Sequence, residues 1–181
     1  MYTGTSYLRS IEFATPTLGF CGTLSNRFLR TNDGGNTWEN IITSITPVPA
    51  GICGLAAPTA ERIYGVGVWS HPANMVRSTD GGDSWSVVHT TGTGSDYIWK
   101  PQTPDGIHLY GSIDGPPGSG TRYVRSSDAG LTWQTDTFTM DYTYVQVIGF
   151  LDSQHGWTGG FNQLFETTDG GETWQIVFFG N

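Results

Sequence analysis

The amino-acid sequence predicts an all-β fold of four repeated units, each built from four short antiparallel strands. Three observations predict it: a composition rich in glycine and aromatic residues, an octapeptide that recurs four times, and short β-forming runs around every copy. Of the 181 residues, 26 are glycine, 13% are aromatic and 13% are charged. This composition excludes a charged disordered chain, which would be poor in aromatics, and disfavours a helical bundle, which relies on Ala, Glu, Lys and Leu.

The recurring octapeptide has the pattern (S/T)-x-D-(G/A)-G-x-(S/T)-W and lies at residues 31–38, 78–85, 126–133 and 167–174. An Asp side chain accepts hydrogen bonds from backbone N–H groups just downstream, and the second glycine suits a positive φ. The Trp begins the next strand with a large apolar surface. The octapeptide therefore predicts a hairpin turn. Its aspartates and tryptophans are Asp33, Asp80, Asp128 and Asp169, and Trp38, Trp85, Trp133 and Trp174.

Each repeat holds room for three strands before the octapeptide and one after it. In the second repeat we expect strands over residues 52–56, 62–68, 75–78 and 85–89. Four antiparallel strands in a repeat of about 40–50 residues are typical of a β-propeller blade. The sequence therefore predicts a single propeller domain over residues 1–181. Its blades are expected over about 6–45, 46–91, 92–138 and 139–181.

The octapeptide resembles the Asp-box, or BNR repeat, of sialidases, two-propeller xyloglucanases, sortilin-type receptors and photosystem II assembly factors of the Ycf48 type. The fourth repeat, with Gly149-Phe150, Gly156-Trp157 and Gly159-Gly160 ahead of its box, is most similar to the Ycf48 type. The resemblance covers all four repeats and implies a β-propeller, but not one activity, because the turn occurs in enzymes and binding proteins alike. It also implies that the box is structural. The sequence agrees, since the box Asp and Trp recur in every blade whereas a functional residue need occur only once.

A binding site is expected on the propeller face opposite the box turns. That face carries the loops between second and third strands and the links between blades, which vary most in length. Trp69 and His71 interrupt a Gly-Val-Gly-Val strand, as either a stacking platform or aromatics packed between blades. The loop aspartates are either a glycosidase pair or solvated residues, and we favour the second. The candidate binding residues are Trp69, His71, Asp96, Tyr97, Asp114, Asp141 and Tyr142.

The charge balance excludes several partners. The net charge is −8 and the chain has 8 Lys and Arg residues in total, so no basic cluster is available for nucleic acid or a membrane surface. No apolar run reaches the roughly 20 residues of a membrane span. Each box offers one or two acidic residues, too few for a calcium loop, so no metal or cofactor is expected. Cys21 and Cys53 are expected to be two buried thiols rather than a disulfide.

We expect a non-catalytic recognition or assembly scaffold that binds a protein or glycan partner. The alternative is a glycoside hydrolase lobe or a carbohydrate-binding propeller. Against a hydrolase, the chain has no sialidase-type Arg-Ile-Pro segment, and Arg30, Arg77 and Arg125 recur just before a box, which indicates a structural role. Scarce lysine and abundant threonine, glycine and tryptophan fit an exported protein, secreted or periplasmic, although residues 1–6 do not resemble a signal peptide.

Four blades are few for a protein of this resemblance, which implies six or more. The chain can form a compact four-bladed ring, or an open arc completed by another copy or by further blades of a longer parent chain. We expect the arc, because the resemblance implies blades shaped for wider rings. An unclosed blade exposes an apolar face, and such a face usually marks an interface.

Overall fold

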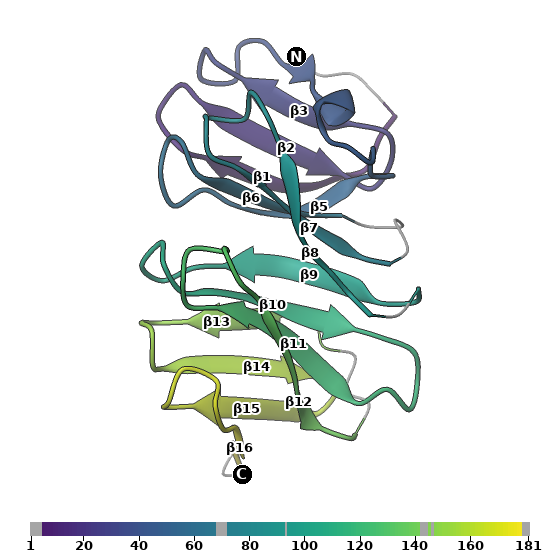
Figure 1. The fold of residues 1–181 in the computed structure, drawn as a ribbon, viewed down its shortest axis with the longest axis vertical. Coiled ribbons are helices and arrows are strands. Elements are labelled where there is room, and N and C mark those ends of the chain that lie inside the picture. The colour runs from purple at the N-terminus through teal and green to yellow at the C-terminus, as the bar shows by residue number, and fades with distance from the viewer. Residues whose placement is uncertain (1–4, 68–71, 93, 142–144, 146, 179–181) are drawn as a thin grey trace. The chain divides into compact units, whose positions relative to one another are not determined.

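The computed structural model describes residues 5–67, 72–92, 94–141, 145 and 147–178. Within them, sixteen strands form four sheets, and each sheet takes four consecutive strands in chain order (Figure 1). The first sheet contains β1 (Leu8–Phe13), β2 (Gly19–Thr23), β3 (Phe28–Thr31) and β4 (Glu39–Asn40). The second contains β5 (Ile52–Ala56), β6 (Ile63–Gly67), β7 (Asn74–Ser78) and β8 (Ser86–Thr90). The third contains β9 (Tyr97–Gln102), β10 (Leu109–Asp114), β11 (Thr121–Ser126) and β12 (Gln134–Thr139). The fourth contains β13 (Val147–Phe150), β14 (Gly156–Gly160), β15 (Gln163–Thr167) and β16 (Gln175–Ile176).

This architecture confirms the predicted all-β class of four-stranded antiparallel sheets. In the second repeat, β5 has the predicted bounds, and the other three strands begin within one residue of the predicted positions. The chain divides into two compact units, residues 1–101 and 102–181, with the boundary inside β9. Residues 1–101 hold the first two sheets, and residues 102–181 hold β10–β12 with the fourth sheet.

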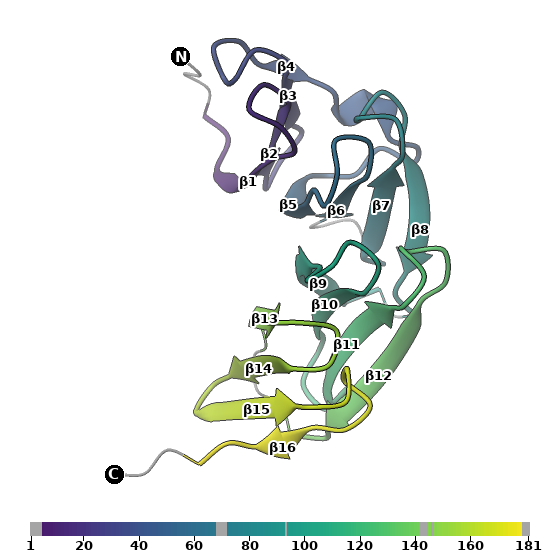
Figure 2. The ribbon, with the colours of Figure 1, turned by 90° about the vertical axis from the view of Figure 1, so that its left-hand side faces the viewer.

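Burial follows the order of the strands within each sheet. Every residue of β2 and β6 is buried, and so is every residue of β10 except the last. The fourth strands β4 and β16 are fully exposed in both their residues. These three buried strands are continuous runs of apolar and small residues without alternation. Figure 2 shows a neighbour of β10 in the C-terminal unit, where β10 and β13 lie side by side.

Two box tryptophans, Trp85 and Trp174, each contact the sheet before their own. Trp85 is 7% exposed and packs edge-on against Phe20 and Phe28 of the first sheet, with ring centroids 6.0 and 5.1 Å apart. Ile42 and Ile45, in and after the short 3₁₀ turn η1 (Ile42–Ser44), complete this core. In the C-terminal unit Trp174 meets Tyr123 of the third sheet in the same edge-on way, at 5.5 Å. The box therefore contributes to the contact between sheets as well as to its own turn.

All four boxes share one hydrogen-bond network. The hydroxyl of the first box residue donates to Oδ1 of the box Asp at 2.8 Å in every copy and accepts the N–H of the second glycine. Oδ1 also accepts the backbone N–H of the seventh residue at 2.9 Å, and Oδ2 accepts the hydroxyl of that residue. The fourth box position has a positive φ in each copy, including Ala129 at 57°. The conserved pattern of the box is thus a pattern of bonds that close the turn on itself.

Ala129 is the one box residue whose side chain opposes its backbone conformation. Because an L-residue in the left-handed region costs about 1–2 kcal/mol and glycine there costs about 0.5–1 kcal/mol in entropy, Ala129→Gly should raise the free energy of unfolding by about 1 kcal/mol. Urea denaturation followed by tryptophan fluorescence measures this change. A fall in the free energy of unfolding would contradict the conclusion that the positive φ of Ala129 is strained. As the opposite control, Gly82→Ala places a Cβ 2.6 Å from a ring carbon of Phe20 and should destabilise the protein.

The tryptophan packing predicts an unequal cost of truncation. Trp85→Ala should lower the free energy of unfolding by about 3–5 kcal/mol, because it empties a buried site between two sheets. Trp38→Ala should cost less, because among the described residues its ring contact is with Phe13 of its own sheet. The same denaturation measurement compares the two variants. Equal costs would show that the contact with a preceding sheet contributes little.

Candidate functional site

The structure places the sequence-predicted binding residues in different settings. Trp69, His71 and Tyr142 lie outside the described residues. Asp96 is 0% exposed, so a partner does not reach its side chain in this conformation. Tyr97 is half-buried and its ring stacks on Trp99 at 6.0 Å. The binding role of this set stays a prediction.

Asp114 and Asp141 belong to the C-terminal unit, at the ends of strands away from the box turns. Asp114 is the last residue of β10 and is half-buried. Asp141 follows β12 and is exposed, and the Thr121 hydroxyl donates to its backbone carbonyl at 2.6 Å. That bond holds the link after β12 beside β11. Asp96 and Tyr97 belong to residues 1–101, so these four residues are divided between the two units.

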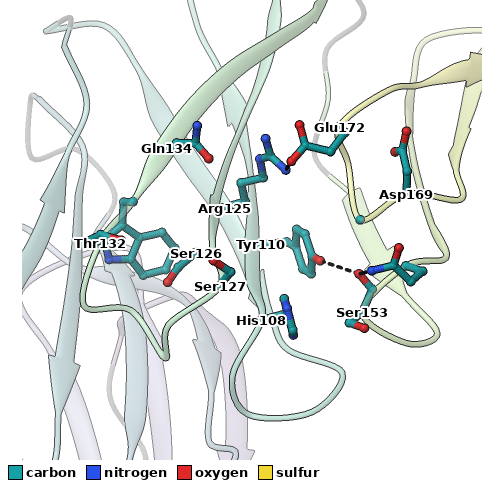
Figure 3. Close-up of a pocket in the computed structure, with 13 residues that line it drawn as sticks. His108, Tyr110, Arg125, Ser126, Ser127, Thr132, Gln134, Ser153, Asp169 and Glu172 are labelled. Carbon is teal, nitrogen blue, oxygen red and sulfur yellow. Dashed lines mark hydrogen bonds and ion pairs between the residues drawn. The ribbon is translucent and has the colours of Figure 1, made fainter.

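A cleft lies instead on the side of the box turns, between the third and fourth sheets (Figure 3). Its volume is about 360 Å³. It is bounded by the box turns of both sheets and by the turns that precede β10 and β14. The lining residues are His108, Tyr110, Arg125, Ser126, Ser127, Thr132, Trp133, Gln134, Ser153, Gln154, Asp169, Gly170 and Glu172. Sequence reasoning missed this site because its walls come from two repeats.

Arg125 forms an ion-pair clamp across this cleft. Its Nε lies 3.0 Å from Oδ2 of Asp136 on β12. Its Nη1 lies 2.6 Å from Oε1 of Glu172 in the next box, and Figure 3 shows these two side chains facing each other. The hydrogen bond with Glu172 raises the pKa of Arg125 and lowers the pKa of Glu172. A second cleft of about 300 Å³ is also lined by Arg125 and Glu172. The clamp therefore borders two clefts, and the positive charge of Arg125 balances one of the two negative charges of Asp136 and Glu172.

The N-terminal unit repeats this clamp. Arg30 lies 2.7 Å from Glu39 of its own sheet and 2.6 Å from Asp83 in the following box. In both units the Arg precedes a box and the acid occupies the sixth position of the next box. The sequence contains this signal, but sequence reasoning took the Arg residues as structural without identifying their partners.

Two stacked rings join the sheets beside the cleft. Tyr110 of β10 and Phe150 of β13 are parallel, with ring centroids 3.4 Å apart and an interplanar angle of 7°. The Tyr110 hydroxyl, which lines the cleft, donates to the backbone carbonyl of Ser153 at 3.2 Å. Burial raises the pKa of Tyr110 to about 12, so its phenol stays protonated near neutral pH. Tyr110 therefore acts as a neutral hydrogen-bond donor.

The turns before β10 and β14 carry matched Asp-x-x-His motifs. In each turn Oδ1 of the Asp accepts the backbone N–H groups of the residues two and three places after it. Asp105 therefore orders the turn that ends at His108, and Asp152 orders the turn that ends at His155. The imidazole Nδ1 of His108 lies 2.6 Å from Asp105, and that of His155 lies 3.0 Å from Asp152. The repeated spacing is visible in the sequence and was not used to predict the site.

The acids of the cleft are engaged in bonds that favour their ionised form. Hydrogen bonds from Thr173 lower the pKa of Asp169, and Arg125 lowers that of Glu172. A general acid needs a raised pKa, so neither carboxyl fits that role. The remaining lining groups are mainly uncharged hydroxyls and amides, which suit hydrogen bonding to a neutral polar ligand.

In the described part of the chain, no three His, Cys, Asp or Glu side chains are grouped closely enough to hold a metal ion. Of the helical segments in the same residues, none has the length and hydropathy needed to span a bilayer. Cys21 and Cys53 are separate buried thiols, which confirms the interpretation made from the sequence.

No family model matches this chain. Among curated proteins, the photosystem II assembly lipoprotein Ycf48 of Picosynechococcus sp. is 46% identical over 43 residues, which are 23% of this chain and 13% of that protein. The matched segment is thus a small part of either protein.

Solved structures with a similar fold include a xyloglucanase and two YCF48 structures. The GH74 xyloglucanase of Xanthomonas campestris has a TM-score of 0.70 at 17% identity, covering 89% of this chain and 28% of that one. YCF48 bound to D1 peptide has a TM-score of 0.57 at 15% identity, covering 96% and 83%. YCF48 from Cyanidioschyzon merolae has a TM-score of 0.64 at 14% identity, covering 98% and 61%. These proteins are β-propellers, so the predicted fold and its resemblance to this group are confirmed. The chain spans less than a third of the xyloglucanase.

The box aspartates predict a loss of stability in acid. Hydrogen bonds, first from the hydroxyls of Thr37, Ser84 and Thr132, lower the pKa values of Asp33, Asp80 and Asp128 to about 2. In the unfolded chain these carboxyls titrate near pH 3.9, at about the model-peptide value. Their contribution is therefore complete above about pH 4 and is lost as the pH falls toward 2.

Urea denaturation at a series of pH values between 7 and 2 measures this loss. Asp80→Asn should make the dependence shallower over the acid range, because it removes one of the titrating groups. Asp141→Asn, which removes an exposed carboxylate outside the boxes, is the matched control. An unchanged slope in Asp80→Asn would mean that the turn bonds do not favour the charged form.

Proposed function

We propose that this protein is a non-catalytic binding scaffold that holds an extended segment of a partner protein in the cleft between its third and fourth sheets. The proposal rests on the charge pairing in that cleft. Arg125, Glu172 and Asp169 are each engaged by fixed partners, and the groups left to a ligand are largely neutral. Extended backbone presents alternating N–H and C=O groups, and hydroxyls and amides bind both.

A protein partner is favoured over a glycan by the structural neighbours. One neighbour is YCF48 bound to D1 peptide, and a segment of this chain matches a protein named as a photosystem II assembly lipoprotein. Their likeness to this chain supports a recognition or assembly role and a location outside the cytoplasm, secreted or periplasmic. Which protein this chain would assemble with does not follow from these names.

A hydrolase is the second candidate, and the xyloglucanase neighbour favours it. Glycoside hydrolysis needs two carboxyl groups about 5–10 Å apart, and one of them must be protonated at the working pH. The cleft carboxyls have lowered pKa values and do not meet this need. A hydrolytic pair would therefore have to come from the opposite face, where Asp114 and Asp141 lie.

Peptides selected from a phage-displayed library test the proposal, with affinity measured by fluorescence anisotropy. Gln134→Ala and Gln154→Ala should each weaken binding by about fivefold to tenfold, because each removes a hydrogen bond worth about 1–1.5 kcal/mol. Asp114→Asn and Asp141→Asn are the matched controls on the other face and should bind normally.

Two other outcomes would replace the proposal. Loss of peptide binding in Asp114→Asn or Asp141→Asn alone would move the site to the opposite face. Turnover of sialosides or β-glucans that either of these variants abolishes would establish the hydrolase. Binding of a glycan array without turnover, lost in the glutamine variants, would keep the cleft and change the ligand.

A further inference from the structure

The first and fourth sheets each present a face that no other sheet covers inside its own unit. The contact between the third and fourth sheets shows how such faces are built. Two residues in different sheets occupy corresponding positions when they have the same strand pairing and the same distance from the box. At these positions the uncovered face of the fourth sheet corresponds to the face with which the third sheet contacts the fourth. The uncovered face of the first sheet corresponds to the face with which the fourth sheet contacts the third.

The third sheet offers Tyr110, Tyr123 and Arg125 to the fourth. Arg125 directly precedes its box, Tyr110 is paired with it across the strands, and Tyr123 lies two residues before it. At these positions the fourth sheet carries Glu166, Trp157 and Leu164. Trp157 and Leu164 are half-buried, so the fourth sheet offers the same kind of apolar surface to a following sheet. Its charge, however, has the opposite sign.

The fourth sheet meets the third with Phe150, Glu172 and Trp174. Phe13, Asn36 and Trp38 hold these positions in the first sheet. The two aromatic pairs have the same geometry: Phe150 and Trp174 are 6.0 Å apart at 82°, and Phe13 and Trp38 are 6.2 Å apart at 82°.

Exposure distinguishes these two faces. Phe150, stacked on Tyr110, is 7% exposed, whereas Phe13 is 41% exposed. Tyr7, Leu8 and Ile11 extend the exposed apolar surface along β1 at 64%, 49% and 61%. The first sheet thus carries the aromatic pair with which the fourth sheet contacts its preceding sheet. No sheet inside residues 1–101 precedes the first sheet and covers that pair.

The charge of the fourth sheet matches the uncovered face of the first sheet. Inside each unit an Arg before one box pairs with an acid in the sixth position of the next, as Arg30 does with Asp83. Glu166 stands in the place of that Arg and forms no ion pair among the residues that the structure describes. An acid opposite it would repel it, whereas the amide of Asn36 can donate a hydrogen bond to it. Asn36 uses one N–H on the carbonyl of Asp33 and keeps a second.

We propose that the fourth sheet of one copy docks onto the first sheet of a second copy, with Glu166 facing Asn36 and Trp157 covering Phe13 and Trp38. The two faces differ, so the association is head to tail and extends into a ring or a filament. It repeats between copies the contact that the third and fourth sheets make within one chain. It does not depend on the peptide-binding cleft.

Sedimentation velocity over a series of protein concentrations tests this interface. The wild-type chain should associate as its concentration rises. Asn36→Asp should weaken association about twofold to fivefold, because it sets two carboxylates against each other at an exposed site. Added salt should reduce that defect by screening. Asn32→Asp, the same charge change at an exposed position of the same turn, is the matched control and should associate like wild type.

A charge swap between two variants tests whether residues 36 and 166 face each other. Asn36→Asp mixed with Glu166→Arg should associate more strongly than Asn36→Asp alone, because it restores between copies the pair that Arg30 and Asp83 form. Both substitutions introduce residues that other blades already carry at these positions, so both variants should fold. Three results would each overturn the proposal: a monomer at every concentration, association that Asn36→Asp leaves unchanged, or mixing that restores nothing. Persistence of association in Gln134→Ala separates this interface from the proposed cleft.

Discussion

One carboxylate in each blade governs the turn on which the rest of the blade depends. The box Asp is bonded through one oxygen to a hydroxyl before it and a backbone N–H after it, and through the other to a second hydroxyl. The backbone from the first to the seventh box residue is thereby closed into a loop. Because the Trp follows this loop directly, its indole is delivered to a set position on the preceding sheet.

The same loop also fixes the position of the sixth box residue, which is acidic in two of the four boxes. The sixth box residue projects beside the Trp, and an acid there meets the Arg of the preceding sheet, as Asp83 meets Arg30. The ring contact and the ion pair act at the same junction, one by excluding water and the other by matching charge. In the C-terminal unit a cleft lies beside this junction, and the paired Arg125 and Glu172 both line it.

The sequence was sufficient for the fold and insufficient for the site, for a physical reason. Strand positions and box turns depend on residues a few places apart, so β5 and its neighbours were predicted to within a residue. The cleft depends on pairs such as Arg125 with Glu172 and Tyr110 with Phe150, which a single repeat does not contain. Asp96 illustrates the opposite error, because an aspartate in a linking segment was expected on the surface and is fully buried. Trp69, His71 and Tyr142 lie outside the described residues and remain predictions.

Both cysteines of the chain lie in the N-terminal unit, in the buried strands β2 and β5. Burial raises the pKa of Cys53 to about 12, so little reactive thiolate forms while the strands stay paired. A thiol reagent therefore modifies these residues only when residues 1–101 open. The rate of that modification measures how often residues 1–101 open. Residues 102–181 have no cysteine and contribute no signal. The chain thus carries a built-in label that reports the opening of residues 1–101 alone.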